Sequence, residues 1–324
     1  MSDSDGLVLA YIFDGNGAGK QIEWSDIDAW KPDDGILWVH LDSNADMSRK
    51  WLFIKSGLSE LSCETLLEQE TRPRIISAED GFIMILRGVN FNPGEDPEDM
   101  VAIRMLFTYN RIISVRYRKV MAIQDINKSI IDGKGPVNSG DFLVRVAEGI
   151  ADRMADIIVD LSDDVDALEV LEFDNKTADI RTDLANLRRK SISLRRHISP
   201  QKDVLYRLSQ ERISFLTDLD RAHIREVAER TTRFIEEIDS ARERATITQE
   251  ELNHTISEKM NRAVYTLSII TTIFLPLSLL TGLLGINVAG IPYAEKPWAF
   301  VAVSCVLVVI SVVLVYLFKK IRWL

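Results

Sequence analysis

The sequence predicts an α+β membrane protein with an N-terminal cytoplasmic α/β domain, long stalk helices and two C-terminal transmembrane helices. Three observations lead to this prediction. Residues 1–135 alternate short strand-like and helix-like runs, residues 136–262 are helical with little interruption, and two apolar segments occupy residues 263–284 and 298–318. The remaining predicted segments are a loop at 285–297 and a basic tail at 319–324.

The N-terminal part contains apolar runs separated by turn-forming residues, which is typical of a small α/β domain. The expected strands are Leu7–Phe13, Ile36–Leu41, Phe82–Asn90, Val101–Tyr109 and Ile112–Tyr117, and the expected helices are Met47–Lys55, Ser59–Glu70 and Met121–Ile131. No Lys-Ser or Lys-Thr pair follows the glycine-rich run from Gly15 to Gly19. We therefore interpret this run as a hairpin turn rather than a phosphate-binding loop.

From residue 136 onward the periodicity is helical. Phe142 to Phe173 and Lys176 to His197 are expected to form an antiparallel pair, followed by a third segment broken near Pro200. No Pro or Gly occurs from Asp218 until Pro276, so a single helix of about 67 residues and roughly 100 Å is predicted to end at Leu284. A helix of this length needs partners, and copies of itself are the natural ones, which predicts a symmetric homo-oligomer.

Each apolar segment continues for about 20 residues without a charged side chain, which is enough to cross a bilayer core of roughly 30 Å. Buried helices of a soluble core are the alternative, but basic residues flank both outer ends: Lys259, Arg262, Lys319, Lys320 and Arg322. The only charged residues in the connecting loop are Glu295 and Lys296. This excess of Lys and Arg places both termini in the cytoplasm. Because the first six residues are polar, no signal peptide is expected.

Small and polar residues recur every three or four positions along the first apolar segment. The stripe consists of Asn261, Val264, Ser268, Thr271, Leu275, Ser278, Gly282 and Gly285, with Asn287 beyond the helix end. A polar side chain that faces lipid is costly, so this pattern favours a stripe that lines an aqueous pore. The alternative is that Ser and Thr only bond to the backbone of their own helix. Pro276 also frees one backbone carbonyl, which could face the pore.

A possible metal-binding pattern precedes the membrane segment. Glu250, His254, Glu258 and Asn261 are spaced four, four and three residues apart, which puts them on one side of a helix. Repeated around a symmetry axis, such side chains would form rings that concentrate cations. Imidazole together with carboxylate suits zinc, whereas carboxylates alone suit magnesium. In a helix this rich in Glu, the alternative is a chance spacing.

A second acidic stretch lies earlier in the chain and contains Asp160, Asp163, Asp164, Asp166, Glu169 and Glu172. It is interpreted as a solvated face, and the alternative is an acidic apron that attracts cations to a pore entrance. The basic residues from Arg188 to Arg196 are expected to neutralise part of it.

Composition excludes several functions. The formal net charge of −10 argues against nucleic acid as a partner. Cys63 and Cys305 are the only cysteines, so neither a disulfide framework nor a cysteine-rich zinc site is available. The sequence contains no HExxH signature and no nucleophile with a placed base, so we expect neither an enzyme nor a bound cofactor.

Motifs near the C-terminus resemble those of the CorA-type divalent metal ion transporters. They are Thr272–Ser278, Gly282, Gly285–Asn287 and Lys319–Leu324. The resemblance implies a funnel-shaped homopentamer in the bacterial inner membrane, whose first membrane helices line a central pore. It also implies that Asn261, Leu275, Ser278 and Asn287 face the pore, that Val264 and Leu267 form an apolar neck, and that Gly285, Ile286 and Asn287 form a loop at the outer mouth.

Other stretches resemble the zinc-transporting, ZntB-like branch of that family: Glu70–Arg74, Met100–Arg104 and Ser114–Val120. The magnesium-transporting branch carries Met where this chain has Ile286. The resemblance therefore implies transport of divalent cations, with zinc preferred. The alternatives are a magnesium or cobalt channel of the same family and a membrane-anchored metal sensor that does not transport. Glu250, His254, Glu258 and Glu295 are the candidate metal ligands.

Overall fold

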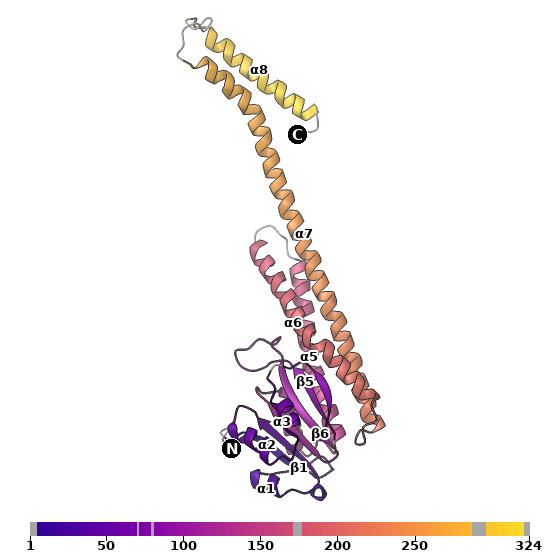
Figure 1. Cartoon of the computed structure of the whole chain (residues 1–324). Helices are drawn as coiled ribbons and strands as arrows, with labels where there is room; N and C mark the ends of the chain where they lie inside the picture. The colour runs from indigo at the N-terminus through magenta and orange to yellow at the C-terminus, as the bar shows by residue number, and fades with distance from the viewer. Residues whose placement is uncertain (1–4, 70, 79–80, 171–176, 287–295, 321–324) are drawn as a thin grey trace. The chain divides into compact units, whose positions relative to one another are not determined.

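The computed structural model describes residues 5–69, 71–78, 81–170, 177–286 and 296–320 (Figure 1). The chain forms two compact units, Met1–Gln249 and Glu250–Leu324. The first unit contains a mixed β-sheet with helices packed against it and a bundle of long helices. The second unit contains the two apolar helices.

A seven-stranded sheet organises the N-terminal domain. Its strands are β1 (Leu7–Phe13), β2 (Gly19–Gln21), β3 (Ile36–Asp42), β4 (Arg74–Ala78), β5 (Gly81–Gly88), β6 (Val101–Thr108) and β7 (Arg111–Arg116). They lie in the order β2-β1-β3-β7-β6-β5-β4. The central pair, β3 and β7, is parallel, and every other neighbouring pair is antiparallel. The central strands are buried on both faces, which explains their nearly continuous apolar sequence.

The two faces of the sheet are covered by different helices. Leu37, Val39 and Leu41 on β3 belong to one core, which includes side chains of α1 (Trp24–Ala29), α2 (Asp46–Ile54) and α3 (Glu60–Leu67). Trp38 alternates to the other face, where its ring meets Phe142 at a centroid distance of 4.9 Å. Phe142 belongs to α5 (Ser139–Glu169), which packs with α4 (Met121–Ile131).

The five strands and three helices predicted for this domain are confirmed, with ends shifted by up to three residues among the described positions. β2, β4, α1 and a 3-10 turn at Pro32–Asp34 were not predicted, because segments of three to six residues are too short to show a period. The glycine-rich run forms the β1–β2 hairpin, as expected. The Asp14 carboxylate accepts the N–H groups of Asn16 at 2.8 Å and Ala18 at 3.0 Å, and Phe13 pairs with Gly19.

The expected break near Pro200 is wrong. α6 (Thr177–Gln210) continues through it for another three turns. Proline removes only one intrahelical hydrogen bond, and the surrounding turns are fixed by packing. Ile198 and Leu205 are buried, and Gln201 accepts the backbone N–H of Arg87 on β5 at 2.7 Å.

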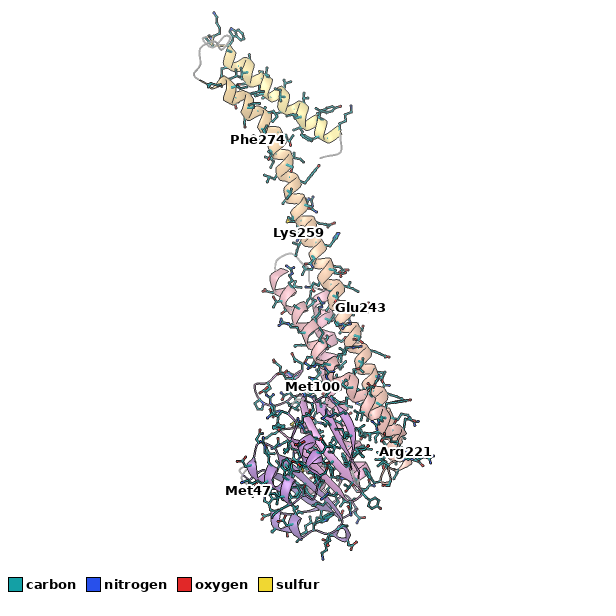
Figure 2. The ribbon with its side chains drawn as sticks, in the orientation of Figure 1. Met47, Met100, Arg221, Glu243, Lys259 and Phe274 are labelled. Carbon is teal, nitrogen blue, oxygen red and sulfur yellow. The ribbon has the colours of Figure 1, made fainter. Side chains whose placement is uncertain are left out.

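α7 (Asp218–Leu284) is a single helix of 67 residues, as predicted. Its first half packs with α5 and α6 through a buried apolar face and through ion pairs such as Arg230 to Asp152 at 2.7 Å and Arg195 to Asp239 at 2.6 Å. Burial on this helix ends at Leu252: none of the residues from 253 to 286 is buried. Lys259 and Phe274, both on this part of α7, are labelled in Figure 2.

A buried histidine makes the stability of the domain depend on pH. His40 on β3 is fully buried, and its Nδ1 lies 2.8 Å from Ser114 Oγ. Burial, together with the Arg116 charge, lowers the pKa of His40 from 6.5 to about 3. The pKa of His40 is lower in the folded than in the unfolded state. The contribution of the neutral ring to the free energy of unfolding is therefore complete above pH 6.5 and is lost as the pH falls towards 3.

We therefore predict that acidification from pH 6.5 to 3 weakens the domain through this residue by on the order of 4 kcal/mol. The urea midpoint, followed by tryptophan fluorescence, should fall less steeply with pH in H40Q than in the unaltered protein. H223Q, which changes a half-exposed ring, should leave the slope unchanged. Equal slopes in H40Q and the unaltered protein would contradict this account.

Candidate functional site

Two apolar helices form the second unit of the structure. The C-terminal part of α7 and the whole of α8 (Ala299–Lys320) are long and apolar enough to cross a membrane, and none of the residues in their apolar stretches is buried. Figure 1 shows α8 running back in the opposite direction from the end of α7. A helix from a soluble core would be covered by its own chain, so the exposure argues against that alternative. Apolar surface of this extent needs lipid or other copies to cover it.

The predicted polar stripe lies on one face of α7. At about 100° per residue, the positions Asn261, Val264, Ser268, Thr271, Leu275, Ser278 and Gly282 fall within an arc of about 100°. Since α7 has no interruption before Leu284, this spacing holds through all of these positions. Leu267 lies at the edge of the same arc. Each of these side chains is exposed in the single chain.

The hydroxyl groups of Ser268 and Thr271 on the stripe donate hydrogen bonds to backbone carbonyls of their own helix. Ser268 Oγ donates to the Val264 carbonyl at 2.9 Å, and Thr271 Oγ1 donates to the Leu267 carbonyl at 2.8 Å. Hydrogen bonding of Ser and Thr to their own helix backbone is the alternative to a pore-lining role that was named from the sequence. The two roles are compatible, because a hydroxyl that donates along the helix keeps oxygen lone pairs that can accept from water.

Pro276 lies inside α7 and has no N–H to donate to the Thr272 carbonyl one turn earlier. Thr272 lies next to the polar stripe, and its own hydroxyl donates to the Ser268 carbonyl at 2.8 Å. The helix therefore presents an uncommitted carbonyl oxygen beside the hydroxyl groups, at mid-length of its apolar part.

The helix ends at the predicted loop. The Gly285 N–H donates to the carbonyls of Thr281 at 3.0 Å and Gly282 at 3.2 Å, and Ile286 is exposed. Asn287 and Glu295, the other two candidate residues of this loop, lie outside the described residues.

The candidate ligands before the membrane segment do not form a complete metal site within one chain. His254 Nδ1 and Glu258 Oε1 lie 3.9 Å apart, both side chains are more than two-thirds exposed, and Glu250 is exposed on the same helix. Among the described residues, no three His, Cys, Asp or Glu side chains are grouped closely enough to hold a metal ion. A site built on these residues would require copies of the helix.

The acidic stretch of α5 meets basic residues of two helices. Arg244 of α7 pairs with Asp166 and Glu169, and these bonds raise the pKa of Arg244. Of the basic residues of α6 that were expected to neutralise part of the stretch, Lys190 lies beside Asp164, whereas Arg188 donates to Gln249 of α7 at 2.8 Å and Arg195 pairs with Asp239 of α7. The reason is geometric, since α7 lies against both partner helices along this stretch.

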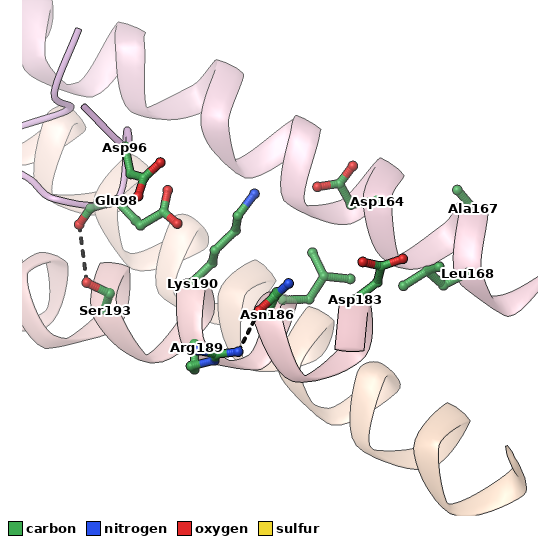
Figure 3. Close-up of a pocket in the computed structure, with 11 residues that line it drawn as sticks. Asp96, Glu98, Asp164, Ala167, Leu168, Asp183, Asn186, Arg189, Lys190 and Ser193 are labelled. Atoms are coloured by element: carbon green, nitrogen blue, oxygen red, sulfur yellow. Dashed lines mark hydrogen bonds between the residues drawn. The ribbon is translucent and has the colours of Figure 1, made fainter. Parts of the chain in front are cut away.

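A cavity of about 650 Å³ lies where α5, α6 and the segment before β6 meet (Figure 3). Its lining includes the carboxylates of Asp96, Glu98, Asp164 and Asp183. Lys190 extends into the space between Asp164 and the Asp96 and Glu98 side chains, which offsets part of the negative charge. The cavity fits the solvated-face interpretation of the acidic stretch.

A second cavity, lined by Arg87, Arg104 and Arg118, was missed by sequence reasoning. These arginines come from two strands and the turn after a third, so no spacing in the sequence indicates that they meet. The only signal was that two stretches used for the branch resemblance, Met100–Arg104 and Ser114–Val120, contribute to its lining.

Comparison with known proteins gives a consistent result. Residues 33–320 match the profile of the family described as CorA-like Mg2+ transporter protein. The chain is 37% identical over 326 residues to the divalent cation transporter CmaX of Pseudomonas aeruginosa, covering 99% of this chain and 98% of that one. It is 35% identical over 320 residues to the zinc transport protein ZntB of Pectobacterium carotovorum subsp. carotovorum, covering 98% and 96%.

Solved structures agree with these relatives. The full-length CmaX structure matches with a TM-score of 0.85 at 35% identity, covering 99% of both chains. The complete CorA magnesium transporter from Methanocaldococcus jannaschii matches with a TM-score of 0.81 over 98% of this chain and 99% of that one, and at 22% identity this likeness shows the fold alone. The predicted fold class, with an α/β domain, long helices and two apolar C-terminal helices, is confirmed.

The geometry of α7 predicts which side chains contact water in the membrane. With Cys305 replaced by Ser, a cysteine at Leu275 or Ser278 should react with a charged methanethiosulfonate reagent about tenfold faster than one at Ile273 or Leu277, which lie on the opposite face. Cys63 is fully buried and should not contribute. Equal reactivity on both faces, measured by mass shift in liposomes, would rule out an aqueous stripe.

Proposed function

The chain belongs to the CorA-like Mg2+ transporter protein family of divalent cation transporters, and on that premise we propose that it carries zinc across the bacterial inner membrane through the central pore of a homopentamer. The observation that carries this proposal is the stripe of polar side chains on the exposed face of one uninterrupted helix. A lipid anchor does not need such a stripe, because hydroxyl groups that face lipid gain nothing.

Five copies of α7 around an axis would turn the stripe into stacked rings. Rings of Val264 and Leu267 would form an apolar neck that closes by dewetting. Above them, rings of Ser268, Thr271 and Ser278 would offer hydroxyl oxygens to water around the ion. Such weak, repeated contacts suit passage of a dication that keeps much of its hydration shell.

The outer mouth of this pore would be formed by Gly285, Ile286 and Asn287. A ring of five Asn287 amides can accept hydrogen bonds from the inner waters of a dication without removing them. Gly285 ends the helix and allows the chain to turn there, and Ile286 replaces the Met of the magnesium-transporting branch.

Zinc is preferred in this proposal because of His254. Its position among Glu250 and Glu258 on the exposed side of α7 would give rings that combine imidazole with carboxylate, a ligand set that suits zinc better than magnesium. The relative ZntB is named a zinc transport protein, which also supports zinc as the ion. The second candidate, a magnesium or cobalt channel, is favoured by the description of the family, CorA-like Mg2+ transporter protein.

The membrane topology proposed from the basic flanks places both termini in the cytoplasm. Neither apolar segment contains a carboxylate or a histidine, so a proton relay inside the membrane has no residues to use. Coupling to protons would use Glu295 in the loop or His254 before the membrane.

Purified protein in liposomes tests this function directly. Zinc uptake that exceeds magnesium uptake, and that is absent from empty liposomes, is the expected result. An imposed pH gradient that increases zinc uptake would indicate proton coupling. Magnesium uptake driven by membrane potential alone would favour the second candidate. No uptake of either ion would favour the membrane-anchored sensor and contradict the proposal.

Replacing the loop amide should impair transport. N287A is expected to reduce zinc uptake about tenfold, which corresponds to about 1.4 kcal/mol of lost stabilisation along the path. N110A, which removes a half-buried amide in the β6–β7 turn, is the matched control. Uptake by N287A equal to that of the control would exclude a role for the loop.

Replacing the imidazole should change the ion preference more than the overall rate. H254Q is expected to lower the ratio of zinc to magnesium uptake by about tenfold or less, since Gln keeps an oxygen ligand and loses the nitrogen that zinc prefers. H223Q removes a histidine of the first unit and should preserve the ratio. An unchanged ratio in H254Q would remove His254 from the selectivity mechanism.

A further inference from the structure

We propose that the arginine-lined cavity of the N-terminal domain is a binding site for a phosphate-type oxyanion, either inorganic phosphate or the phosphate group of a nucleotide. The cavity has a volume of about 560 Å³. It lies within the first unit and is lined by residues of β5, β6, α6 and the turns beside them. Met100, labelled in Figure 2, marks its place in the fold.

The central residue of the site is Arg104 on β6, which is only 1% exposed. Its Nη2 donates to the Gln69 carbonyl at 2.8 Å, and its guanidinium lies 5.0 Å from the centre of the Tyr117 ring. Its Nε has no hydrogen-bond partner among the described residues, and no ion pair is formed there by Arg104. The Glu68 charge acts on Arg104, but the Glu68 carboxylate is paired with Arg74. A buried guanidinium without a directly bound counter-charge is costly, so this arrangement suggests that an anion completes it.

The neighbours of Arg104 add to the positive charge. Arg87 donates to the carbonyls of Thr71 at 2.8 Å and Met100 at 2.6 Å, and these bonds fix its guanidinium at the cavity wall. Arg118 lies at the rim, where it pairs with Glu95 at 2.7 Å. Burial lowers the pKa of Arg104 to about 10, so this side chain stays charged at neutral pH.

His197 of α6 provides a second unpartnered group. Its Nδ1 is buried and has no hydrogen-bond partner among the described residues. Burial, followed by the charges of Arg87, Arg196 and Arg72, lowers the pKa of His197 to about 4. The ring is therefore neutral at pH 7 and can donate a hydrogen bond to an oxyanion that the arginines hold.

An oxyanion is the ligand class that fits these groups. Arginine offers several N–H donors in one plane, which matches the oxygens of phosphate. Among the described residues of the lining, Asp99 is the only carboxylate and is exposed, so a metal cation would meet mainly positive charge. The volume also lies in the range of small-molecule sites, which leaves room for a nucleotide.

Three stretches of sequence that had no assigned role meet at this cavity. Met100–Arg104 and Ser114–Val120 contribute lining residues, and Thr71 from the third stretch accepts the hydrogen bond from Arg87. All three precede the apolar C-terminal helices in the chain by more than 100 residues. In this proposal the three stretches form one oxyanion site, and that role does not depend on which ion crosses the membrane.

Titration of the full-length protein in detergent tests this proposal. Inorganic phosphate and ATP would be added separately in a metal-free, phosphate-free buffer, with binding measured by calorimetry. One ligand per protomer is expected.

Three variants test which residues hold the ligand. R104K, which keeps the charge but loses the planar donors, should weaken binding at least tenfold. D99N, which removes the one carboxylate among the described lining residues, should strengthen it about three- to tenfold. D163N, an exposed carboxylate of α5 outside the cavity, should have no effect.

Stronger binding by D99N cannot arise from a folding defect, so the proposal remains testable even if R104K destabilises the domain. Equal affinities for phosphate and ATP would identify free phosphate as the ligand, and much tighter ATP binding would identify a nucleotide. If neither binds at about 10 mM, or if R104K and D99N bind like the unaltered protein, the proposal is overturned. Loss of the oligomer in R104K without any phosphate binding would indicate that a carboxylate of a neighbouring copy fills the cavity, which also overturns it.

Discussion

The structure depends on one constraint: the second half of α7 and all of α8 carry apolar surface that their own chain does not cover. Burial on α7 stops at Leu252, although the helix continues to Leu284. An isolated helix gains little stability in water without tertiary packing, so this part of the chain needs lipid or other helices around it. The bilayer supplies one partner for the apolar faces, and copies of the chain are the natural partner for the polar stripe.

The α/β domain and the helical bundle meet the opposite requirement. There the apolar side chains are enclosed, with β3 buried on both faces, and ion pairs such as that of Arg230 with Asp152 connect the helices of the bundle. The charged surface of this unit keeps most of the chain in water. Membership of a divalent cation transporter family is consistent with the apolar helices, since transport requires a path through the membrane.

Sequence reasoning succeeded where a period or a long uninterrupted run was available. The 67-residue helix and the strands around Val39 and Phe107 follow from local pattern. It failed where tertiary contacts decide. α6 continues through Pro200, where Gln201 is held by β5 and the neighbouring turns are packed. Asp166 and Glu169 of α5 pair with Arg244 of α7, which lies far away in the sequence, and Arg87, Arg104 and Arg118 meet only after the sheet has formed.

The measurement that tests the central account most directly is disulfide cross-linking between copies in native membranes. With Cys305 replaced by Ser, a cysteine at Ser278 should give a ladder of covalent species that ends at five chains under mild oxidation, because the stripe of α7 would lie around a common axis. A cysteine at Ile273 on the opposite face should not. A ladder from Ile273 and none from Ser278, or one that ends at two chains, would contradict a pentameric pore lined by this stripe.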